Sequence, residues 1–162
     1  MIAARRIVAG FTLLELVVVI VIATILSAFT IARINTQSFD TEGFANRVAA
    51  MVRFAQKLAI SQRRAVHVVI SSNKVSLCYV VTNCGTPTAV SPVHEPPGTN
   101  AFSYSAPSGV MLADLTFSFN ALGRAYDSLG VPIAGALTIA VTGDGTKTIT
   151  IAEETGYVQY VP

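Results

Sequence analysis

Residues 11–34 read FTLLELVVVIVIATILSAFTIARI, and this stretch decides how the rest of the chain is organised. Its only charged side chains are Glu15 near the start and Arg33 near the end. As a helix rising about 1.5 Å per residue, it would extend about 36 Å, which is enough to cross a bilayer. We therefore predict a transmembrane helix over residues 11–34.

The ten residues before this stretch, MIAARRIVAG, form a short basic leader that contains Arg5 and Arg6. Positive residues stay on the cytoplasmic side, so they predict a single-pass protein whose C-terminal part lies outside the cytoplasm. A secretory signal peptide would be cut after its apolar region, and no convincing Ala-x-Ala site follows closely here. We therefore expect the apolar stretch to be retained.

Glu15 is the informative residue within the apolar stretch. A charged and unpaired carboxylate in lipid costs several kcal/mol on some scales, so it needs a partner or a proton. If the chain were cut after Gly10, the new α-amino group of Phe11 would be positive near neutral pH. This amine could neutralise Glu15 of a neighbouring subunit packed side by side. The alternative is that Glu15 merely lies at the depth of the lipid headgroups.

Residues 10–15, GFTLLE, preceded by basic residues and followed by LVVVI, resemble the class III signal of type IV prepilins and type II secretion pseudopilins. The resemblance implies that a prepilin peptidase cuts between Gly10 and Phe11 and methylates Phe11. It also implies that Glu15 matches the family's membrane-embedded glutamate. One departure is that many major pilins carry a proline in the apolar segment, whereas this chain has none before Pro87.

The same resemblance implies a location and a set of partners. The protein would lie in the inner membrane, with its C-terminal domain in the periplasm, before it enters a pilus or pseudopilus filament. Its partners would be the prepilin peptidase, other pilins or pseudopilins, the inner membrane and the inner-membrane assembly platform.

The helical pattern continues over residues 35–63 but becomes amphipathic. Apolar side chains at three- and four-residue steps predict one buried face, made of Phe44, Val48, Met51, Ala55 and Leu58. The basic side chains Arg47, Arg53, Lys57 and Arg64 are more simply a solvated face than a dedicated binding stripe. Together with residues 11–34, this pattern predicts one helix of about 50 residues, half of which must lie outside a globular core.

Residues 64–162 are predicted to form a β-rich domain. Apolar and β-branched residues over 65–70 and 74–81, joined by Ser71-Ser72-Asn73, indicate a hairpin. Further strands are predicted at residues 115–119, 136–141, 146–151 and 157–161, with a turn at Gly143-Asp144-Gly145. Residues 82–109 are rich in proline, glycine, serine and threonine, which predicts a long loop with little regular structure.

A second and looser resemblance lies in this domain. Leu115-Thr116-Phe117 leading to Leu122-Gly123-Arg124, and later Glu154-Thr155-Gly156-Tyr157-Val158, look similar to the GspH/FimT group of minor pilins and pseudopilins, which includes minor subunits of mannose-sensitive-haemagglutinin (MSHA) pili. The expected fold is α+β. One long N-terminal helix, first transmembrane and then amphipathic, packs on a C-terminal antiparallel β-sheet domain in the ladle shape of pilins.

The two cysteines, Cys78 and Cys84, are separated by five residues. Outside the cytoplasm they would lie in an oxidising compartment, where we expect them to pair. Two unpaired thiols are the alternative, because pairing requires a geometry that sequence does not provide.

The residue inventory argues against an enzyme. There are two histidines, no Gly-x-Ser-x-Gly motif, no Walker loop and no zinc-ligand spacing. His67 is expected to be a packed or surface imidazole, because no second ligand stands at a recognisable spacing. Beyond Arg33, eight basic residues balance eight acids, which argues against binding to nucleic acid. We predict no catalytic residue, no metal site and no cofactor.

These features predict a minor pilin or pseudopilin that assembles through its N-terminal helix and helps to initiate or cap a type IV pilus or a type II secretion pseudopilus. The alternative is a binding module displayed on the pilus, either an adhesin or a receptor for DNA uptake. Only Arg124 and Lys147 are basic beyond Lys74, which argues against the DNA receptor but leaves adhesion through the proline-rich loop open.

Overall fold

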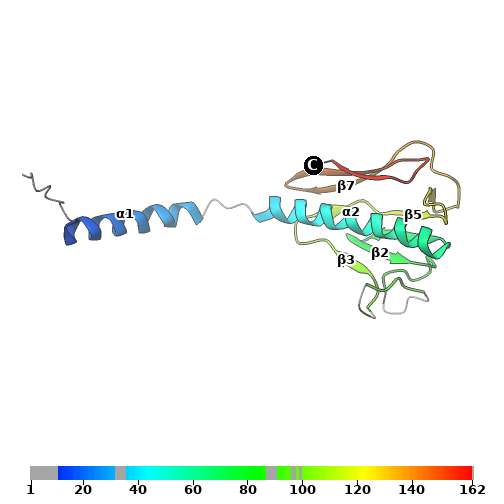
Figure 1. Cartoon of the computed structure of the whole chain (residues 1–162), viewed down its shortest axis with the longest axis horizontal. Coiled ribbons are helices and arrows are strands. Elements are labelled where there is room, and N and C mark those ends of the chain that lie inside the picture. Colours follow the sequence, from blue (N-terminus) through cyan, green and yellow to red (C-terminus); the bar gives the residue numbers. More distant parts are fainter. Residues whose placement is uncertain (1–10, 32–35, 87–90, 96–97, 99, 162) are drawn as a thin grey trace, which may run out of the picture. The chain divides into compact units, whose positions relative to one another are not determined.

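The computed structural model describes the chain except residues 1–10, 32–35, 87–90, 96–97, 99 and 162, and it describes the backbone but not the side chains of residues 28–31 and 36 (Figure 1). The chain divides into two compact units, Met1–Asn35 and Thr36–Pro162. One continuous helix was predicted over residues 11–63. The structure has two helices here, and the residues that join them, 32–35, lie outside the described part of the chain.

The first unit contains the helix α1, Leu13–Ile31. The described side chains of residues 11–27 are all exposed, and most of them are apolar. The hydroxyls of Thr24 and Ser27 donate to the carbonyl oxygens of Val21 and Ala23, at 2.8 and 2.7 Å. The polar side chains in the middle of α1 are therefore satisfied by the helix itself.

The predicted transmembrane helix over residues 11–34 includes positions that the structure does not describe. Among the described residues, no helix is both long and apolar enough to cross a membrane.

The second unit begins with the helix α2, Thr36–Gln62. Its buried face contains Phe44, Val48, Met51 and Ala55, with Leu58 partly buried, which confirms the predicted amphipathic pattern. The helix ends where Arg63 adopts a left-handed conformation with a φ of 51°. The N–H of Arg64 then donates to the carbonyl of Ala59 at 3.2 Å, a common way of ending a helix.

Nine strands follow α2 in the described part of the chain, and they form two antiparallel sheets. The first sheet has the order β3-β2-β1-β5-β6, and the second has the order β4-β7-β8-β9. The strands of the first sheet are β1 Val66–Ser71, β2 Lys74–Cys78, β3 Ser103–Ser105, β5 Leu115–Phe119 and β6 Ala125–Asp127. Those of the second are β4 Met111–Leu112, β7 Leu137–Gly143, β8 Gly145–Ile151 and β9 Val158–Val161.

The α2 helix packs against both sheets, and the core lies where they meet. The helix contacts β1 and β5 of the first sheet and β7, β8 and β9 of the second (Figure 1). The largest fully buried side chains come from α2 and from both sheets; they include Phe117, Phe119, Ile70, Ile149 and Val48. The α+β fold with antiparallel pairing is as predicted, but the β-domain contains two sheets where one was expected.

The predicted hairpin over residues 65–81 is confirmed as β1 and β2, although β2 ends at Cys78. Ser72 and Asn73 form its turn, and both have positive φ values, 53° and 59°. A two-residue turn of this kind matches the natural twist of a hairpin. The four later strands also form close to the predicted positions, as β5, β7, β8 and β9.

The prediction that residues 82–109 have little regular structure is partly wrong. Residues 103–105 form β3, in which Tyr104 pairs with Val75 of β2. The strands β4 and β6 were not predicted either. Each of these three strands has only two or three residues. Such strands are too short to show an alternating pattern, and their pairing depends on the backbone of a neighbouring strand.

The side chain of Gln56 joins α2 to a turn of each sheet. Its Nε2 donates to the carbonyl oxygen of Gly123 at 3.0 Å and to that of Thr155 at 2.9 Å. The first acceptor lies between β5 and β6, and the second lies between β8 and β9. Gly156 follows with a φ of 63°, and a Cβ there would collide with the carbonyl oxygen of Gly123. The two turns approach each other so closely that only glycine fits.

We predict that Gly156→Ala lowers the free energy of unfolding by about 3 kcal/mol, because it adds a steric collision to an unfavourable left-handed backbone. All five tyrosines belong to the second unit, so urea unfolding followed by tyrosine fluorescence in detergent reports on that unit alone. The matched control is Gly130→Ala, where φ is 79° but a Cβ would meet open space. An equal loss in both variants would contradict the close approach of the two turns.

Candidate functional site

The N-terminal end of α1 contains the residues predicted for processing and assembly. Phe11 and Thr12 precede the helix, and Glu15 lies in its first turn. The Thr12 hydroxyl oxygen accepts a hydrogen bond from the N–H of Glu15 at 3.2 Å, and the Thr12 carbonyl accepts one from the N–H of Leu16 at 3.1 Å. Thr12 is therefore the N-cap of α1. Gly10 lies outside the described residues.

The Thr12-x-x-Glu15 spacing is a helix-start signal that the sequence analysis did not use. A threonine at the N-cap followed three residues later by glutamate is typical of a capping box. A carboxylate in the first turn also interacts favourably with the positive end of the helix dipole. Glu15 therefore helps to begin α1.

The surface of α1 is apolar on all sides. Exposed large side chains run from Phe11 to Leu26, and they include Leu13, Leu14 and Ile25. No other helix or strand is described in this unit. A helix that is apolar all round is normally buried, either in protein or in lipid.

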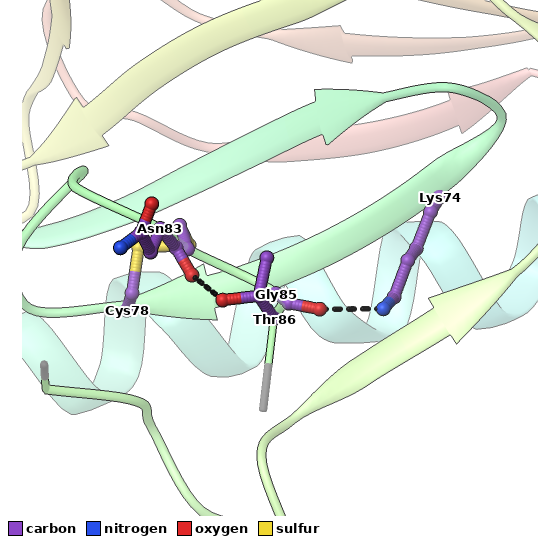
Figure 2. Close-up of a disulfide and its surroundings, with 6 residues drawn as sticks. Lys74, Cys78, Asn83, Gly85 and Thr86 are labelled. Atoms are coloured by element: carbon purple, nitrogen blue, oxygen red, sulfur yellow. Dashed lines mark hydrogen bonds between the residues drawn. A yellow bond between two sulfur atoms is a disulfide. The ribbon is translucent and has the colours of Figure 1, made fainter. Parts of the chain in front are cut away.

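Cys78 at the end of β2 forms a disulfide with Cys84, with a Cα–Cα distance of 5.8 Å (Figure 2). Two further contacts stabilise the chain after Cys84. The Lys74 ammonium donates to the carbonyl of Gly85 at 2.5 Å, and the Thr86 hydroxyl donates to the carbonyl of Asn83 at 2.7 Å (Figure 2). The start of the proline-rich segment is thus held against β2.

Aromatic residues of the proline-rich segment pack on α2. Phe102 stacks on Phe54 with ring centroids 5.2 Å apart, and Tyr104 stacks on Phe44 at 5.7 Å. The Arg47 guanidinium lies 4.0 Å from the centroid of the Tyr104 ring. A shallow groove of about 500 Å³ lies between α2 and this segment; Arg47, Ala50, Met51, Phe54, Glu95 and Phe102 line it.

The basic face predicted on α2 is exposed, but three of its members make specific contacts. Besides Arg47, the Arg53 side chain donates to the carbonyl of Val158 at 3.2 Å. Arg64 was predicted on the same face but lies just beyond the end of α2, and its guanidinium is 3.6 Å from the centroid of the Tyr79 ring. These side chains attach α2 to neighbouring segments, which is a different role from that of a purely solvated face.

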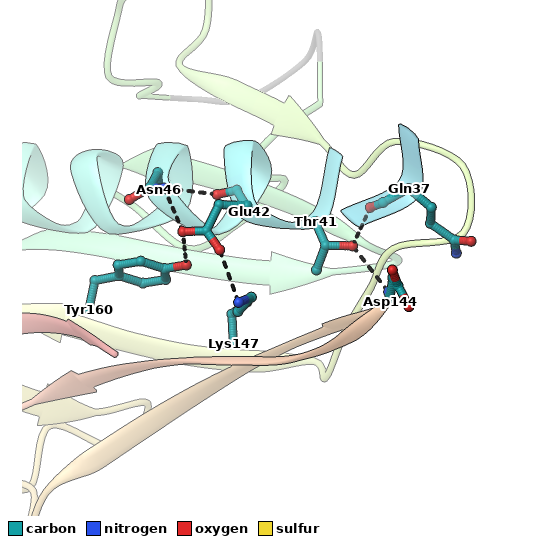
Figure 3. Close-up of polar contacts among 7 residues, drawn as sticks. All are labelled: Gln37, Thr41, Glu42, Asn46, Asp144, Lys147 and Tyr160. Atoms are coloured by element: carbon teal, nitrogen blue, oxygen red, sulfur yellow. Dashed lines mark hydrogen bonds and ion pairs between the residues drawn. The ribbon is translucent and has the colours of Figure 1, made fainter. Parts of the chain in front are cut away.

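Glu42 on α2 accepts hydrogen bonds from three side chains (Figure 3). The Tyr160 hydroxyl donates at 2.5 Å, the Lys147 ammonium at 3.0 Å and the Asn46 amide at 3.3 Å. The hydrogen bond from Tyr160 and then that from Lys147 lower the pKa of Glu42, because they stabilise the carboxylate. Burial, followed by the hydrogen bond to Glu42, raises the pKa of Tyr160 to about 12.

A second polar contact joins α2 to the second sheet at Thr41, the residue just before Glu42. The Thr41 hydroxyl donates to the carbonyl of Gln37 at 2.8 Å and accepts from the N–H of Asp144 at 3.3 Å (Figure 3). Gly143 leaves room for it, since a Cβ there would collide with the Thr41 side chain. The predicted turn at residues 143–145 therefore also serves as a contact for α2.

His67 lies half-buried on β1, and burial lowers the pKa of its imidazole. In the described part of the chain, no group of three or more histidine, cysteine, aspartate or glutamate side chains could hold a metal ion.

The comparisons with known proteins match both units. The prokaryotic N-terminal methylation motif matches residues 5–31. The fold is similar to that of the type IV minor pilin FimU of Pseudomonas aeruginosa PAO1, with a TM-score of 0.56 and 18% identity over 78% of this chain and 92% of that one. It is also similar to the minor pseudopilin EpsH of the Vibrio cholerae type 2 secretion system, with a TM-score of 0.54 and 12% identity over 75% of this chain and 96% of that one.

The chain therefore combines a prokaryotic N-terminal methylation motif with a pilin-like fold. No curated protein matches it by sequence. In this pilin-like chain, the methylation motif covers the predicted residues Gly10, Phe11 and Glu15, whereas Cys78 and Cys84 belong to the second unit. The sequence analysis missed Thr12, Gln56 and Glu42. Only Thr12 has a local signal, because the partners of the other two are distant in the sequence.

We predict that Glu42→Gln destabilises the pilin-like protein at neutral pH, because it removes the carboxylate that Tyr160 and Lys147 contact. The pKa of Glu42 is lowered by folding, so its contribution to stability is present above the unfolded pKa and is lost as the pH falls through the folded value. The difference in urea midpoint between variant and wild type should therefore narrow as the pH falls below about 4.5.

The control for this comparison is Asp40→Asn, which removes an exposed carboxylate from the same helix. Its urea midpoint should stay close to that of the wild type. A deficit in Glu42→Gln that is the same at neutral and acidic pH would show that the charge of Glu42 does not stabilise the fold.

Proposed function

We propose that this pilin-like protein is a minor pilin or minor pseudopilin. It is cut between Gly10 and Phe11 by a prepilin peptidase, methylated at Phe11, and assembled through α1 into a type IV pilus or a type II secretion pseudopilus. There it helps to initiate or cap the filament. The observation that carries this proposal is a methylation motif placed at the start of an apolar helix whose described side chains are all exposed.

Burial of α1 would occur in two successive environments. Before assembly, residues 11–34 would anchor the chain in the inner membrane, with Arg5 and Arg6 on the cytoplasmic side and residues 36–162 in the periplasm. During assembly, the same surface would pack against the helices of other pilins or pseudopilins, supplied by the inner-membrane assembly platform. The hydroxyls of Thr24 and Ser27 donate to carbonyl oxygens of α1 itself. This supports both stages, because an unpaired polar group is costly both in lipid and in a packed helix bundle.

Glu15 would set the position of each subunit along the filament. Cleavage after Gly10 would create an amine on Phe11, and this charge could pair with Glu15 of a neighbouring helix. Within its own chain, Glu15 lies in the first turn of α1, so its carboxylate lies close to the end of the helix that a neighbour's amine must reach.

We further propose that the protein belongs to the GspH/FimT group. The two short segments that resemble this group meet in space, although 30 residues separate Arg124 from Glu154. The Arg124 guanidinium donates to the Glu154 carboxylate at 3.0 Å, and Gln56 contacts the backbone of both segments. The two segments therefore form one contact region of the fold, which supports treating them together as a single resemblance to this group.

A second candidate function is adhesion by the exposed domain. The observation that favours it is the groove between α2 and the proline-rich segment, which combines the aromatic rings of Phe54 and Phe102 with the charged side chains of Arg47 and Glu95. If the domain is an adhesin, Phe102→Ala should leave filament assembly normal but abolish attachment of the cell to its target surface. We propose neither an enzymatic activity nor a nucleic-acid partner.

We predict that Glu15→Ala leaves the chain cleaved and inserted in the membrane but reduces its amount in the sheared filament fraction by at least tenfold, because the proposed partner of the Phe11 amine is lost. The measurement is intact-mass analysis of the membrane and sheared fractions of the native host. Ser27→Ala is the matched control, since its hydroxyl contacts only its own helix among the contacts described. Normal incorporation of Glu15→Ala would remove Glu15 from the assembly mechanism.

The same mass analysis tests processing in the wild type. A chain that begins at Phe11 and carries one added methyl group is the expected mature form. A chain that still begins at Met1 would exclude the prepilin pathway and leave a simple membrane anchor.

We propose that the disulfide between Cys78 and Cys84 is present in the mature protein, as its exported location would permit. Alkylation of the denatured protein without reductant should modify neither cysteine, and alkylation after reduction should modify both. Modification of both thiols without reductant would contradict the pairing.

A further inference from the structure

We propose that Thr12 is a positioning residue for leader cleavage. By capping α1, it keeps Phe11, whose nitrogen belongs to the bond to be cut, outside the helix, where a peptidase can bind and cut that bond. This inference rests on the proposed cleavage between Gly10 and Phe11, and it concerns how that bond is presented.

The start of α1 is defined by two hydrogen bonds to the same residue. The Thr12 hydroxyl accepts from the N–H of Glu15 at 3.2 Å, and the Thr12 carbonyl accepts from the N–H of Leu16 at 3.1 Å. The helix begins at Leu13, so Phe11 lies two positions before it. The Phe11 side chain is 76% exposed. The nitrogen of the bond to be cut therefore belongs to a residue that is neither helical nor buried.

The chemistry of cleavage explains why this position matters. Water adds to the carbonyl carbon of Gly10, the bond from that carbon to the Phe11 nitrogen breaks, and the nitrogen takes a proton. The products are a carboxylate on Gly10 and an amine on Phe11. In a helix, that carbonyl would be hydrogen-bonded to the N–H four residues ahead, which belongs to Leu14. Proteolysis of such a bond depends on the fraction of chains in which it is open.

In the membrane location proposed above, α1 would begin in apolar surroundings, and Thr12 would then control the fraction of chains in which this bond is open. The first N–H groups of a helix have no partner within it, and leaving them unpaired is costly where water is absent. Without an acceptor on residue 12, the N–H groups of Leu14 and Glu15 can be satisfied by the carbonyls of Gly10 and Phe11. Forming those bonds would extend the helix over the bond to be cut. Because the N–H of Glu15 already donates to the Thr12 hydroxyl, it would gain no additional hydrogen bond from a longer helix. The Thr12 hydroxyl therefore makes this extension less favourable.

The test uses the full chain in detergent and a purified prepilin peptidase, with cleavage rates followed by mass spectrometry. Thr12→Val keeps the shape of the side chain but removes the acceptor. We expect its kcat/KM to fall about fivefold, the factor that corresponds to a typical N-cap contribution of about 1 kcal/mol. Thr12→Ser and Thr12→Asn keep an acceptor and should be cleaved within about twofold of the wild-type rate.

A double variant separates capping from direct recognition of the hydroxyl. Proline is well tolerated at the first helical position, and it disfavours a helical conformation in the residue before it. In the double variant Thr12→Val, Leu13→Pro, the proline should keep the helix from extending toward Phe11 although the hydroxyl is absent. Its cleavage rate should therefore equal that of Leu13→Pro alone. A double variant that is still cleaved several-fold more slowly than Leu13→Pro would overturn the proposal, because the peptidase would then be contacting the hydroxyl itself.

Backbone carbon chemical shifts of Phe11 give a readout that does not depend on the peptidase. They should move toward helical values in Thr12→Val and stay non-helical in the wild type and the double variant. Unchanged shifts in Thr12→Val would also overturn the proposal. Failure of the proposed function has a different signature, because the wild type itself would then not be cut between Gly10 and Phe11.

Discussion

The second unit depends on the packing of one helix against two sheets. The α2 helix contacts strands of both, and its buried face supplies the side chains around which they close. Apolar burial gives this arrangement its stability but little directionality. Polar contacts at two places along α2 fix the orientation of the helix on the sheets. Glu42 meets Tyr160 and Lys147 in its first half, and Gln56 meets the backbone of two turns near its end.

The two helices of the chain meet different burial requirements. In α2, apolar residues follow the helical period, so one face is covered by the sheets and the other remains in water. In α1, the apolar residues have no such period, so a single covering surface would not be enough. The α2 helix is suited to a fixed partner, the two sheets of its own domain. In the proposed function, α1 would be covered first by lipid and then by the helices of other subunits.

The sequence allowed much of this fold to be predicted, because its strongest signals are local. The period of Phe44, Val48 and Met51 located the buried face of α2, and Ser72-Asn73 located the first hairpin. The division into two sheets could not be predicted, since alternation identifies a strand but not its neighbour. The contacts of Gln56 span 67 and 99 residues, and no short pattern indicates them. In the candidate site, the residues of the motif were found because they are adjacent, whereas Glu42 depends on partners more than a hundred residues away.

The edge strands of the two sheets are short, and some of their backbone groups are already occupied. The strands β3, β4 and β6 have at most three residues, and Arg53 takes the carbonyl of Val158 at the start of β9. Beside β6, the N–H of Asp127 donates to the carbonyl of Val131 at 2.9 Å, and Tyr126 pairs with Pro132, which has no N–H to offer. Long open edges invite strands of other molecules to add to a sheet. In the proposed filament, such edges would protect a subunit that is crowded against its neighbours from uncontrolled strand exchange and would leave its association to its helices.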